Sequence, residues 1–287
     1  MLMKIELLPE LAEQALIDEV MVYPKPGLVD PLNHGSHPDM DVFTFVASAV
    51  SLRAYFEEIT ELANNFTAAN LPKLFQQVRL AGIKAEQTMF KATNGINTHK
   101  GAIFSLGILL TASAYTLSST GCIELDEIAQ TVKVMLKGLT KNDFRNLDQK
   151  PLDELTAGEL EYKKYGLTGS RGEAEAGFPV VFKKSLPFLL TKSNQSRNSQ
   201  LIDTLMQIVL TTKDSNLIKR AGNLEIVDWA EAQASRYFEL GGSQTEEGYL
   251  FLRNLDDVFT QQHLSLGGSA DLLILTIFLD LLVTKNS

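Results

Sequence analysis

Residues that can do chemistry gather in a few short segments between stretches of helical periodicity. The first segment, residues 23–41, mixes prolines and glycines, which enforce a non-helical path, with charged residues and histidines. Its candidate functional residues are Lys25, Asp30, His34, His37, Asp39 and Asp41. Lysine can contact a phosphate, and carboxylates are oxygen ligands that suit Mg²⁺. The alternative is that Asp39 only caps the helix expected to begin near Asp41.

The second segment, residues 94–101, precedes a long apolar stretch. Asn97 or Thr98 can cap the helix that follows, which leaves backbone N–H groups free to face an anion. Lys100 follows His99 at the predicted helix start, where the helix dipole disfavours positive charge. A bound phosphate would resolve that conflict. The alternative is an ordinary capped turn with a solvated lysine.

The third segment, residues 170–179, combines an arginine with two glutamates. Arg171 offers a planar fork of donors that matches a phosphate. Glu173 and Glu175 can hold a cation, orient a hydroxyl or accept a proton. The alternative is that Arg171 and Glu175, four residues apart, form a modest salt bridge on a helix surface.

The fourth segment, residues 263–271, opens the last predicted helix. The backbone N–H groups of Gly267, Gly268 and Ser269 can form a concave anion site at a helix start. Asp271 would repel a bare phosphate and therefore suits a metal-bridged or sugar-hydroxyl contact. The alternative is simple N-capping by Ser269. A weaker fifth segment, residues 214–222, supplies Arg220.

Helical elements must position these segments. Apolar residues recur at three- and four-residue spacing along most of the chain, and no alternating pattern typical of strands is found. Residues 102–118 and 270–283 are apolar nearly all round, which indicates central helices. We therefore predict an all-α bundle of roughly ten helices with its active site in the inter-helix loops. No low-complexity linker divides the chain, so we expect one domain over residues 1–287.

Composition excludes several classes of protein. The formal net charge of −9 argues against nucleic-acid binding, and the single cysteine, Cys122, excludes a disulfide framework and a multi-cysteine zinc site. The N-terminus lacks a basic start followed by a long apolar stretch, so we expect no signal peptide. The two apolar stretches look too short and too rich in Ser, Thr or Asp to span a bilayer. We expect a cytoplasmic protein without a membrane partner.

Together the segments supply cations for phosphate and carboxylates for a metal or a proton, as in an Mg²⁺-dependent enzyme acting on a phosphorylated substrate. They also resemble the triphosphoribosyl-dephospho-CoA synthase family in five motifs, in family order over most of the chain: Tyr23-Pro-Lys-Pro-Gly-Leu-Val-Asp30, Gly35-Ser-His-x-Asp-Met-Asp41, Asn97-Thr-His-Lys-Gly-Ala-Ile-Phe104, Ser170-Arg-Gly-Glu-Ala-Glu175 and Gly267-Gly-Ser-Ala-Asp-Leu-Leu273. Two departures are Leu266, where the family pattern has proline, and Ala221, where it has glycine after Arg220.

The resemblance implies a specific reaction. The ribose 2′-hydroxyl of 3′-dephospho-CoA attacks the ribose carbon of ATP, adenine leaves, and the triphosphate stays on the transferred sugar. A separate carrier-protein transferase would attach the product to the acyl-carrier subunit of citrate lyase, or of malonate decarboxylase. The sequence leaves open which of these is the client, and whether the protein is a monomer or a homodimer.

The same resemblance suggests roles for the candidate residues. Lys25, Lys100, Arg171 and Arg220, with Gly267, Gly268 and Ser269, would bind ATP, and Asp39, Asp41 and Asp271 would hold Mg²⁺. Asp30, Glu173 and Glu175 compete with Asp271 for the part of general base or second-metal ligand. His37 and His99 would assist the departing adenine or orient a phosphate. Sequence alone does not rank these roles.

Two other enzyme classes and a binding protein are the rival interpretations. A metal-dependent phosphohydrolase would use His34, His37 and Asp39, although such sites usually need adjacent His-Asp and Pro38 intervenes here. A helical ADP-ribosyl-type glycohydrolase would use water as the acceptor in place of a hydroxyl. A nucleotide-binding module without catalysis would have little use for so many carboxylates beside phosphate-binding cations.

Overall fold

The computed structural model describes residues 4–145, 147, 150–151 and 154–286. Every regular element in that part of the chain is a helix, so the predicted all-α class is confirmed. The helices are more numerous than the roughly ten expected from periodicity, because several short segments form separate helices. The prediction about a signal peptide concerns in part residues 1–3, which lie outside the described residues.

The first half of the chain forms a short 3₁₀ helix (Ile5–Leu7) and seven α-helices: α1 (Leu8–Val20), α2 (Val42–Ser51), α3 (Arg53–Asn64), α4 (Leu71–Ala92), α5 (Lys100–Thr120), α6 (Leu125–Met135) and α7 (Leu139–Asp143). The second half forms α8 (Ala157–Tyr165), α9 (Gly169–Glu175), a π-helical turn (Val181–Ser185), α10 (Leu186–Leu190), α11 (Arg197–Val209), α12 (Ser215–Ala221), α13 (Glu225–Glu239), a 3₁₀ turn (Gly242–Gln244), α14 (Glu246–Gln261) and α15 (Gly267–Asn286).

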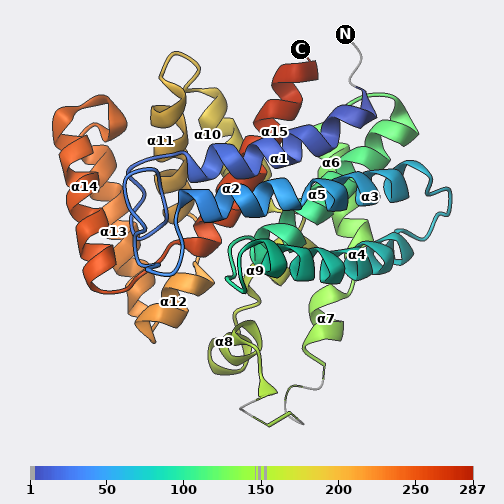
Figure 1. The fold of residues 1–287 in the computed structure, drawn as a ribbon, viewed down its shortest axis with the longest axis horizontal. Coiled ribbons are helices and arrows are strands. Elements are labelled where there is room, and N and C mark those ends of the chain that lie inside the picture. Colours follow the sequence, from blue (N-terminus) through green and yellow to red (C-terminus); the bar gives the residue numbers. More distant parts are fainter. Residues whose placement is uncertain (1–3, 146, 148–149, 152–153, 287) are drawn as a thin grey trace.

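The two all-round apolar helices, α5 and α15, form the centre of the bundle. α5 packs against α3, α4 and α6 and also contacts α15, which in turn packs on α1 and α11. Figure 1 shows α1 to α4 as a layer that passes in front of α5. Because neighbours surround both helices, neither needs a polar face, which explains their sequence pattern.

Both central helices are also long and apolar enough to cross a membrane, judged by length and composition alone. They have 21 and 20 residues, so the prediction that these stretches are too short was wrong. Each helix extends past its apolar run at both ends. In the fold, 78% and 61% of their most apolar windows are buried inside the protein. This burial is the property of core helices.

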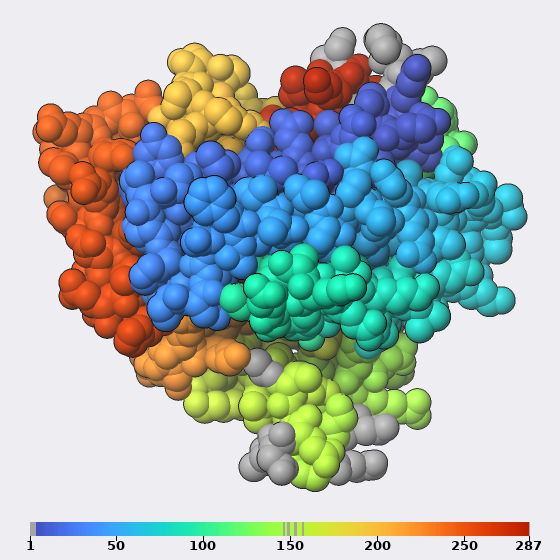
Figure 2. All heavy atoms as spheres, viewed as in Figure 1, coloured from blue at the N-terminus to red at the C-terminus, as the bar shows by residue number. Residues whose placement is uncertain are grey.

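One connected cluster of buried apolar residues reaches from Leu8 on α1 to Leu282 on α15. Figure 2 shows how α1 to α4 cover one face of this core, with α13 and α14 along its edge. A small second cluster, made of Phe144, Leu147 and Leu155, lies in the segment that joins α7 to α8. The helices that carry the predicted site residues therefore rest largely on a common core.

Two buried aspartates fix the proline-rich segment between α1 and α2. Asp30 accepts hydrogen bonds from three backbone N–H groups of its own segment. Asp256 on α14 accepts from the Gly27 N–H at 2.9 Å and from the Asn33 amide at 3.0 Å. Gly27 has a φ of +67°, and a Cβ there would lie 2.3 Å from the Leu264 carbonyl oxygen. Only glycine fits this close approach to the last loop.

A third buried aspartate, Asp214, caps two helices at once. It precedes α12 and accepts the N–H groups of Asn216 and Leu217 at 2.8 and 3.1 Å. It also accepts the N–H groups of Gly268 and Ser269 at 3.2 and 2.6 Å, and the Ser269 hydroxyl at 2.8 Å. These groups have no partner within their own helices. One carboxylate therefore joins the first turns of α12 and α15.

We expect Asp214→Ala to lower the free energy of unfolding by about 1–4 kcal/mol, because each lost N-cap costs about 0.5–2 kcal/mol and this residue caps two helices. Urea unfolding followed by circular dichroism measures the change. Asp41→Ala is the matched control, since Asp41 caps α2 alone and is exposed. Equal losses in the two variants would contradict the double-cap interpretation.

Candidate active site

Three adjoining cavities meet near the starts of α5 and α15 and along α12. They are named here the apolar pocket, of about 640 Å³, the polar pocket, of about 550 Å³, and the Glu173 pocket, of about 430 Å³. Gly101 and Lys219 line both the apolar and the polar pocket, and Asn216 and Asp271 line both the polar and the Glu173 pocket. The cavities therefore form one branched cleft, and each branch has the size of a usual ligand site.

The polar pocket brings together residues that lie far apart in the sequence. The α1–α2 segment, the starts of α5 and α15, and α12 each contribute to its lining. The predicted site residues among its walls are Lys25, His37, Asp39, His99, Arg220, Gly267 and Asp271. The fold thus gathers much of the predicted cation and carboxylate set in one cavity.

His37 and Arg220 form one wall of the polar pocket. Arg220 Nη1 donates to the carbonyl oxygens of Ser36 and His263, at 3.2 and 2.9 Å, and Nη2 lies 3.2 Å from His37 Nδ1. His37 Nε2 lies 3.0 Å from Ser265 Oγ. Burial, and then the Arg220 charge, lower the pKa of His37 to about 4. His37 is therefore neutral at physiological pH, and the guanidinium is the anion-binding group of this wall.

Lys25 is a fully enclosed cation, 1% exposed, that also lines the polar pocket. Its Nζ donates to the carboxylate of Glu19 on α1 and, at 2.7 Å, to the Glu19 carbonyl oxygen. A buried ammonium group requires such partners, because removing it from water without pairing its charge is costly. The ammonium group of Lys25 therefore remains bound to α1, and the Glu19 carboxylate, which also lines the pocket, balances its charge.

Asp271 lies at the junction of the branches. Its carboxylate packs so closely on Gly101 that a Cβ at that glycine would lie 2.0 Å from Asp271 Oδ2. Burial, and then the charges of Asp214 and Glu19, raise the pKa of Asp271 to about 8. The carboxyl group is therefore mostly protonated at neutral pH. A pKa near the working pH is the property expected of a general acid or base.

His99 occupies the N-cap position of α5 and is 1% exposed. Its Nδ1 lies 2.7 Å from Ser48 Oγ on α2, and its ring meets Phe45 edge to face with centroids 5.0 Å apart. Burial, and then the Lys25 charge, lower the pKa of His99 to about 3. The ring is therefore neutral, so at physiological pH it can donate or accept a hydrogen bond but carries no charge.

Lys100 lines the apolar pocket, where its charge has a protein partner. Its Nζ lies 2.9 Å from the carboxylate of Glu86 on α4, and its backbone N–H donates to Asn97 Oδ1 at 3.3 Å. The conflict expected between this lysine and the helix dipole is thus relieved by a carboxylate of the protein, without a need for phosphate. The cap expected from Asn97 or Thr98 is supplied in part by Asn97.

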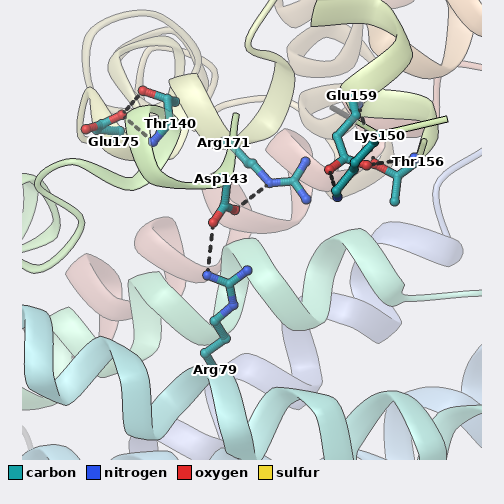
Figure 3. A network of polar contacts seen from close by, with 8 residues as sticks. All are labelled: Arg79, Thr140, Asp143, Lys150, Thr156, Glu159, Arg171 and Glu175. Atoms are coloured by element: carbon teal, nitrogen blue, oxygen red, sulfur yellow. Dashed lines mark hydrogen bonds and ion pairs between the residues drawn. The ribbon is translucent and has the colours of Figure 1, made fainter. Parts of the chain in front are cut away.

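Arg171 on α9 faces the apolar pocket as part of a charged network. Its Nε donates to Asp143 Oδ2 at 2.9 Å, and Arg79 Nη1 on α4 donates to Asp143 Oδ1 at 3.1 Å. Figure 3 shows Asp143 between the two guanidinium groups. The alternative of an Arg171–Glu175 salt bridge is wrong, because Asp143 takes that place. Each guanidinium keeps further N–H donors for a ligand.

Glu175 and Asp30, predicted as candidate bases, serve the backbone instead. Glu175 accepts the N–H groups of Gly138 and Thr140 at 2.7 and 3.0 Å, as well as the Thr140 hydroxyl (Figure 3). These hydrogen bonds lower its pKa even though burial opposes the shift. Asp30 holds its own loop, as described above. Both lie outside the lining of the cleft and have a clear structural role, while their catalytic roles stay predictions.

Asp41, predicted as a metal ligand, is the N-cap of α2. Its carboxylate accepts the Thr44 N–H at 2.9 Å and the Thr44 hydroxyl at 2.8 Å, and these bonds lower its pKa. The chain is extended at Asp41, with φ of −139°, so the helix begins at residue 42 and Asp41 takes the cap. The alternative that gave this cap to Asp39 is therefore wrong. Asp39 lines the polar pocket.

The backbone N–H groups at Gly267–Ser269 do bind an anion, as predicted, but that anion is a carboxylate of the protein itself, Asp214. The N–H groups of Gly268 and Ser269 bind the Asp214 carboxylate, and Ser269 is buried. The cap alternative, which gave this role to Ser269, is also wrong, because Asp214 caps the helix. Gly267 still lines the polar pocket. Of the predicted trio, therefore, Gly267 alone faces the polar branch of the cleft.

Glu173 lines the third branch of the cleft. Its Oε1 accepts the Val180 N–H at 2.8 Å. Burial raises the pKa of Glu173 against the opposing effect of that hydrogen bond. The remaining oxygen can face a ligand in the Glu173 pocket, so this residue stays a candidate for a proton-transfer role.

The predicted metal ligands do not form one cluster. In the part of the chain that the structure describes, no group of three or more His, Cys, Asp or Glu side chains could hold a metal ion. Mg²⁺ bound with a nucleotide, however, typically uses only one or two carboxylates, with phosphate and water supplying the other ligands. Asp39 in the polar pocket fits that requirement, whereas Asp271 is mostly protonated at neutral pH and is a poor Mg²⁺ ligand in that form.

Several residues of the cleft were missed by the sequence reasoning. Lys219 lines both the polar and the apolar pocket, and its place next to Arg220 was the signal that could have found it. Arg79 and Asp143 lie outside glycine-rich segments, so nothing in their local sequence marks them. Ser48 contacts His99 from a helix interior and is equally unmarked.

These features define a helical protein whose cleft has cations, carboxylates and an apolar branch, as an enzyme that handles a nucleotide requires. Comparison with known families identifies it further. Residues 5–287 match the model of the CitG family, described as ATP:dephospho-CoA triphosphoribosyl transferase. The chain belongs to this family, and it is a triphosphoribosyl transferase.

Relatives with similar sequences agree with this assignment. A probable 2-(5″-triphosphoribosyl)-3′-dephosphocoenzyme-A synthase of Lactiplantibacillus plantarum is 53% identical over 94% of this chain and 95% of its own length. One of the same name from Streptococcus equi subsp. zooepidemicus is 40% identical over 93% and 94%. Protein CitXG of Leuconostoc mesenteroides is 47% identical over 93% of this chain, but over 57% of its own length. No solved structure matches significantly.

We expect Asp271→Asn to raise the melting temperature by an amount that grows with pH between 3.8 and about 8 and then levels off. In the folded protein this carboxyl keeps its proton up to about pH 8, whereas in the unfolded chain it ionises near 3.8. Rising pH in that window therefore favours unfolding, and asparagine removes the effect. Calorimetry at stepped pH measures it, with exposed Asp126→Asn as the control. A difference independent of pH would contradict the raised pKa.

Proposed function

We propose that this chain transfers the 5-triphosphoribosyl group of ATP to the ribose 2′-hydroxyl of 3′-dephospho-CoA and releases adenine. The single observation that carries the proposal is the branched cleft, in which a polar and an apolar cavity share Gly101 and Lys219, with the Asp271 carboxyl packed on Gly101 from the polar side. A transfer between two large substrates needs two binding branches with their reacting atoms at the junction. Hydrolysis needs only one such branch and water.

ATP occupies the polar pocket in this proposal. Arg220 and Lys219 are surface-accessible cations on its wall and contact the triphosphate, while Lys25 is paired with Glu19 and holds the α1–α2 segment in place. Charge-assisted contacts of this kind offset the repulsion that a protein of net charge −9 exerts on a polyanion.

The acceptor occupies the apolar pocket. The pantetheine arm of dephospho-CoA is long and largely apolar, and it suits walls that include Phe75, Val78 and Ile83. Its pyrophosphate meets the cations of this branch, Lys100 and Arg171. This placement directs the 2′-hydroxyl of the acceptor toward the junction.

The chemistry at the junction is a displacement at C1′ of the ATP ribose. The acceptor 2′-oxygen forms a bond to C1′, the C1′–N9 bond breaks, and its electron pair leaves with adenine. The hydroxyl proton passes to a carboxylate and ends on the adenine, so the step is balanced without another reactant. Asp271, in the fraction that is ionised near its pKa of about 8, is the proposed proton acceptor, and Glu173 is the second candidate. Negative charge near C1′ also stabilises the oxocarbenium-like transition state.

Mg²⁺ enters the proposal as a partner of the triphosphate. Asp39 would hold it at the mouth of the polar pocket, and the ion would supply charge neutralisation to the phosphate oxygens. The product then passes to a carrier-protein transferase that serves citrate lyase or malonate decarboxylase. The family assignment supports this client class.

The test is incubation with ATP, Mg²⁺ and dephospho-CoA, followed by chromatography of adenine and phosphate. We expect adenine release that depends on dephospho-CoA, together with a product whose mass includes both substrates less adenine. Adenine release from ATP alone would indicate a glycohydrolase, and phosphate release a phosphohydrolase. Binding without turnover would indicate a nucleotide-binding module. Each of these three results contradicts the proposal.

We further expect Asp39→Asn to lower adenine release at least about tenfold and to raise the Mg²⁺ concentration required, because it removes a carboxylate ligand. Asp41→Ala should keep adenine release within about twofold and lower the melting temperature instead, because Asp41 caps α2 and alanine cannot. Rates over an Mg²⁺ titration, combined with melting curves, separate the two residues. Equal loss of turnover in both variants would restore Asp41 as a metal ligand.

A further inference from the structure

His99 has one ring nitrogen whose hydrogen-bonding capacity the protein does not use. Its Nδ1 contacts Ser48 Oγ, but Nε2 is buried and has no hydrogen-bond partner among the described residues. The side chain lines the polar pocket. An unpartnered buried polar atom is costly, so such an atom on a cavity wall points to a ligand group that completes it.

The hydroxyls next to this histidine determine which nitrogen carries the proton. Thr98 Oγ1 donates to Ser48 Oγ at 2.7 Å, so the Ser48 oxygen already accepts one hydrogen bond. Ser48 is fully buried, and its own hydroxyl proton needs an acceptor, which His99 Nδ1 provides at 2.7 Å. When Nδ1 accepts, the single proton of the neutral ring resides on Nε2. The chain of donors thus runs from Thr98 through Ser48 to His99 and ends in an N–H on the cavity wall.

We propose that Ser48 and Thr98 are positioning residues that hold His99 as the Nε2–H tautomer, and that this N–H donates to a ring nitrogen of the adenine that leaves ATP. The second part of the inference rests on the proposed function. As the C1′–N9 bond breaks, its electron pair spreads over the purine onto N3 and N7. A hydrogen bond donated to either nitrogen becomes stronger as negative charge develops on the departing base. It therefore stabilises the transition state more than it stabilises bound ATP.

The other contents of the polar pocket favour adenine over phosphate as the acceptor. Arg220 and Lys219 line the same cavity and provide charged donors for phosphate, which a neutral imidazole does not match. Phe45 lines the cavity as well and packs edge to face on His99, so an aromatic surface adjoins the N–H. This combination suits a purine base, which can pack against an aromatic ring and accept a hydrogen bond from a neutral N–H. His99 keeps its proton throughout.

The tautomer is tested directly by long-range ¹H–¹⁵N NMR of protein labelled in histidine, with the His99 signals assigned by their loss in His99→Gln. We expect the Nε2–H pattern in the unchanged protein and its partial or complete loss in Ser48→Ala. Thr98→Val, at a half-buried position, is the second variant and should weaken the pattern less. Ser51→Ala is the matched control, because its hydroxyl lies on the same helix but donates only to the Ser48 carbonyl oxygen. An Nδ1–H pattern in the unchanged protein would overturn the inference.

The contact with adenine is tested with ATP analogues in which carbon replaces N7 or N3. We expect one analogue to lower adenine-type base release at least fivefold in the unchanged protein and in Ser51→Ala. In His99→Leu the effect of the same replacement should be at least fivefold smaller, because only the intrinsic difference between the two leaving bases remains once the donor is gone. If the ratio of base-release rates between ATP and the analogue is the same in the unchanged protein and in His99→Leu, the proposed contact is overturned. Failure of the proposed function is distinguishable, since base release would then be absent or independent of dephospho-CoA, while the NMR result still decides the tautomer.

Discussion

The buried carboxylate of Asp214 is the interaction on which the arrangement of the cleft depends. It satisfies backbone N–H groups at the starts of both α12 and α15, and these helices carry Lys219, Arg220 and Asp271. Because the first turns of the two helices share one cap, their relative position is fixed at the point where the polar pocket begins. The buried charge that this requires is tolerated because it accepts several short hydrogen bonds. Its field in turn contributes to the high proton affinity of Asp271.

Many groups that could bind an anion or a cation from solution are paired with other groups of the protein. Asp30, Asp214 and Glu175 each accept several hydrogen bonds from loops or helix starts, and Lys25 is bound to Glu19. Such internal pairs make long loops rigid without a sheet or a disulfide to support them. They also leave a smaller set of groups free to act on a substrate than the number of charged residues suggests. Rigid loops around a cleft are what a displacement between two large molecules needs.

The sequence predicts the helical class and the two central helices, because periodicity and all-round apolarity depend on burial alone. It also finds segments that meet in the cleft, since ordering a long irregular loop between two helices is costly unless the loop builds something. It cannot tell whether a carboxylate faces a ligand or a backbone N–H, because that depends on partners far away in the chain. For this reason the backbone hydrogen bonds accepted by Asp41 and Glu175 were not predicted. Asp143 and Ser48 were missed because their importance comes only from the residues opposite them.

The close approach of Asp271 to Gly101 links two positions separated by most of the chain. A side chain at 101 would occupy the volume of the carboxylate, so the two sites cannot vary independently. An exchange at 101 is compatible with the fold only if residue 271 becomes shorter, and a shorter residue there removes the acid at the junction. The packing therefore predicts that, among chains that share this architecture, residues 101 and 271 change together.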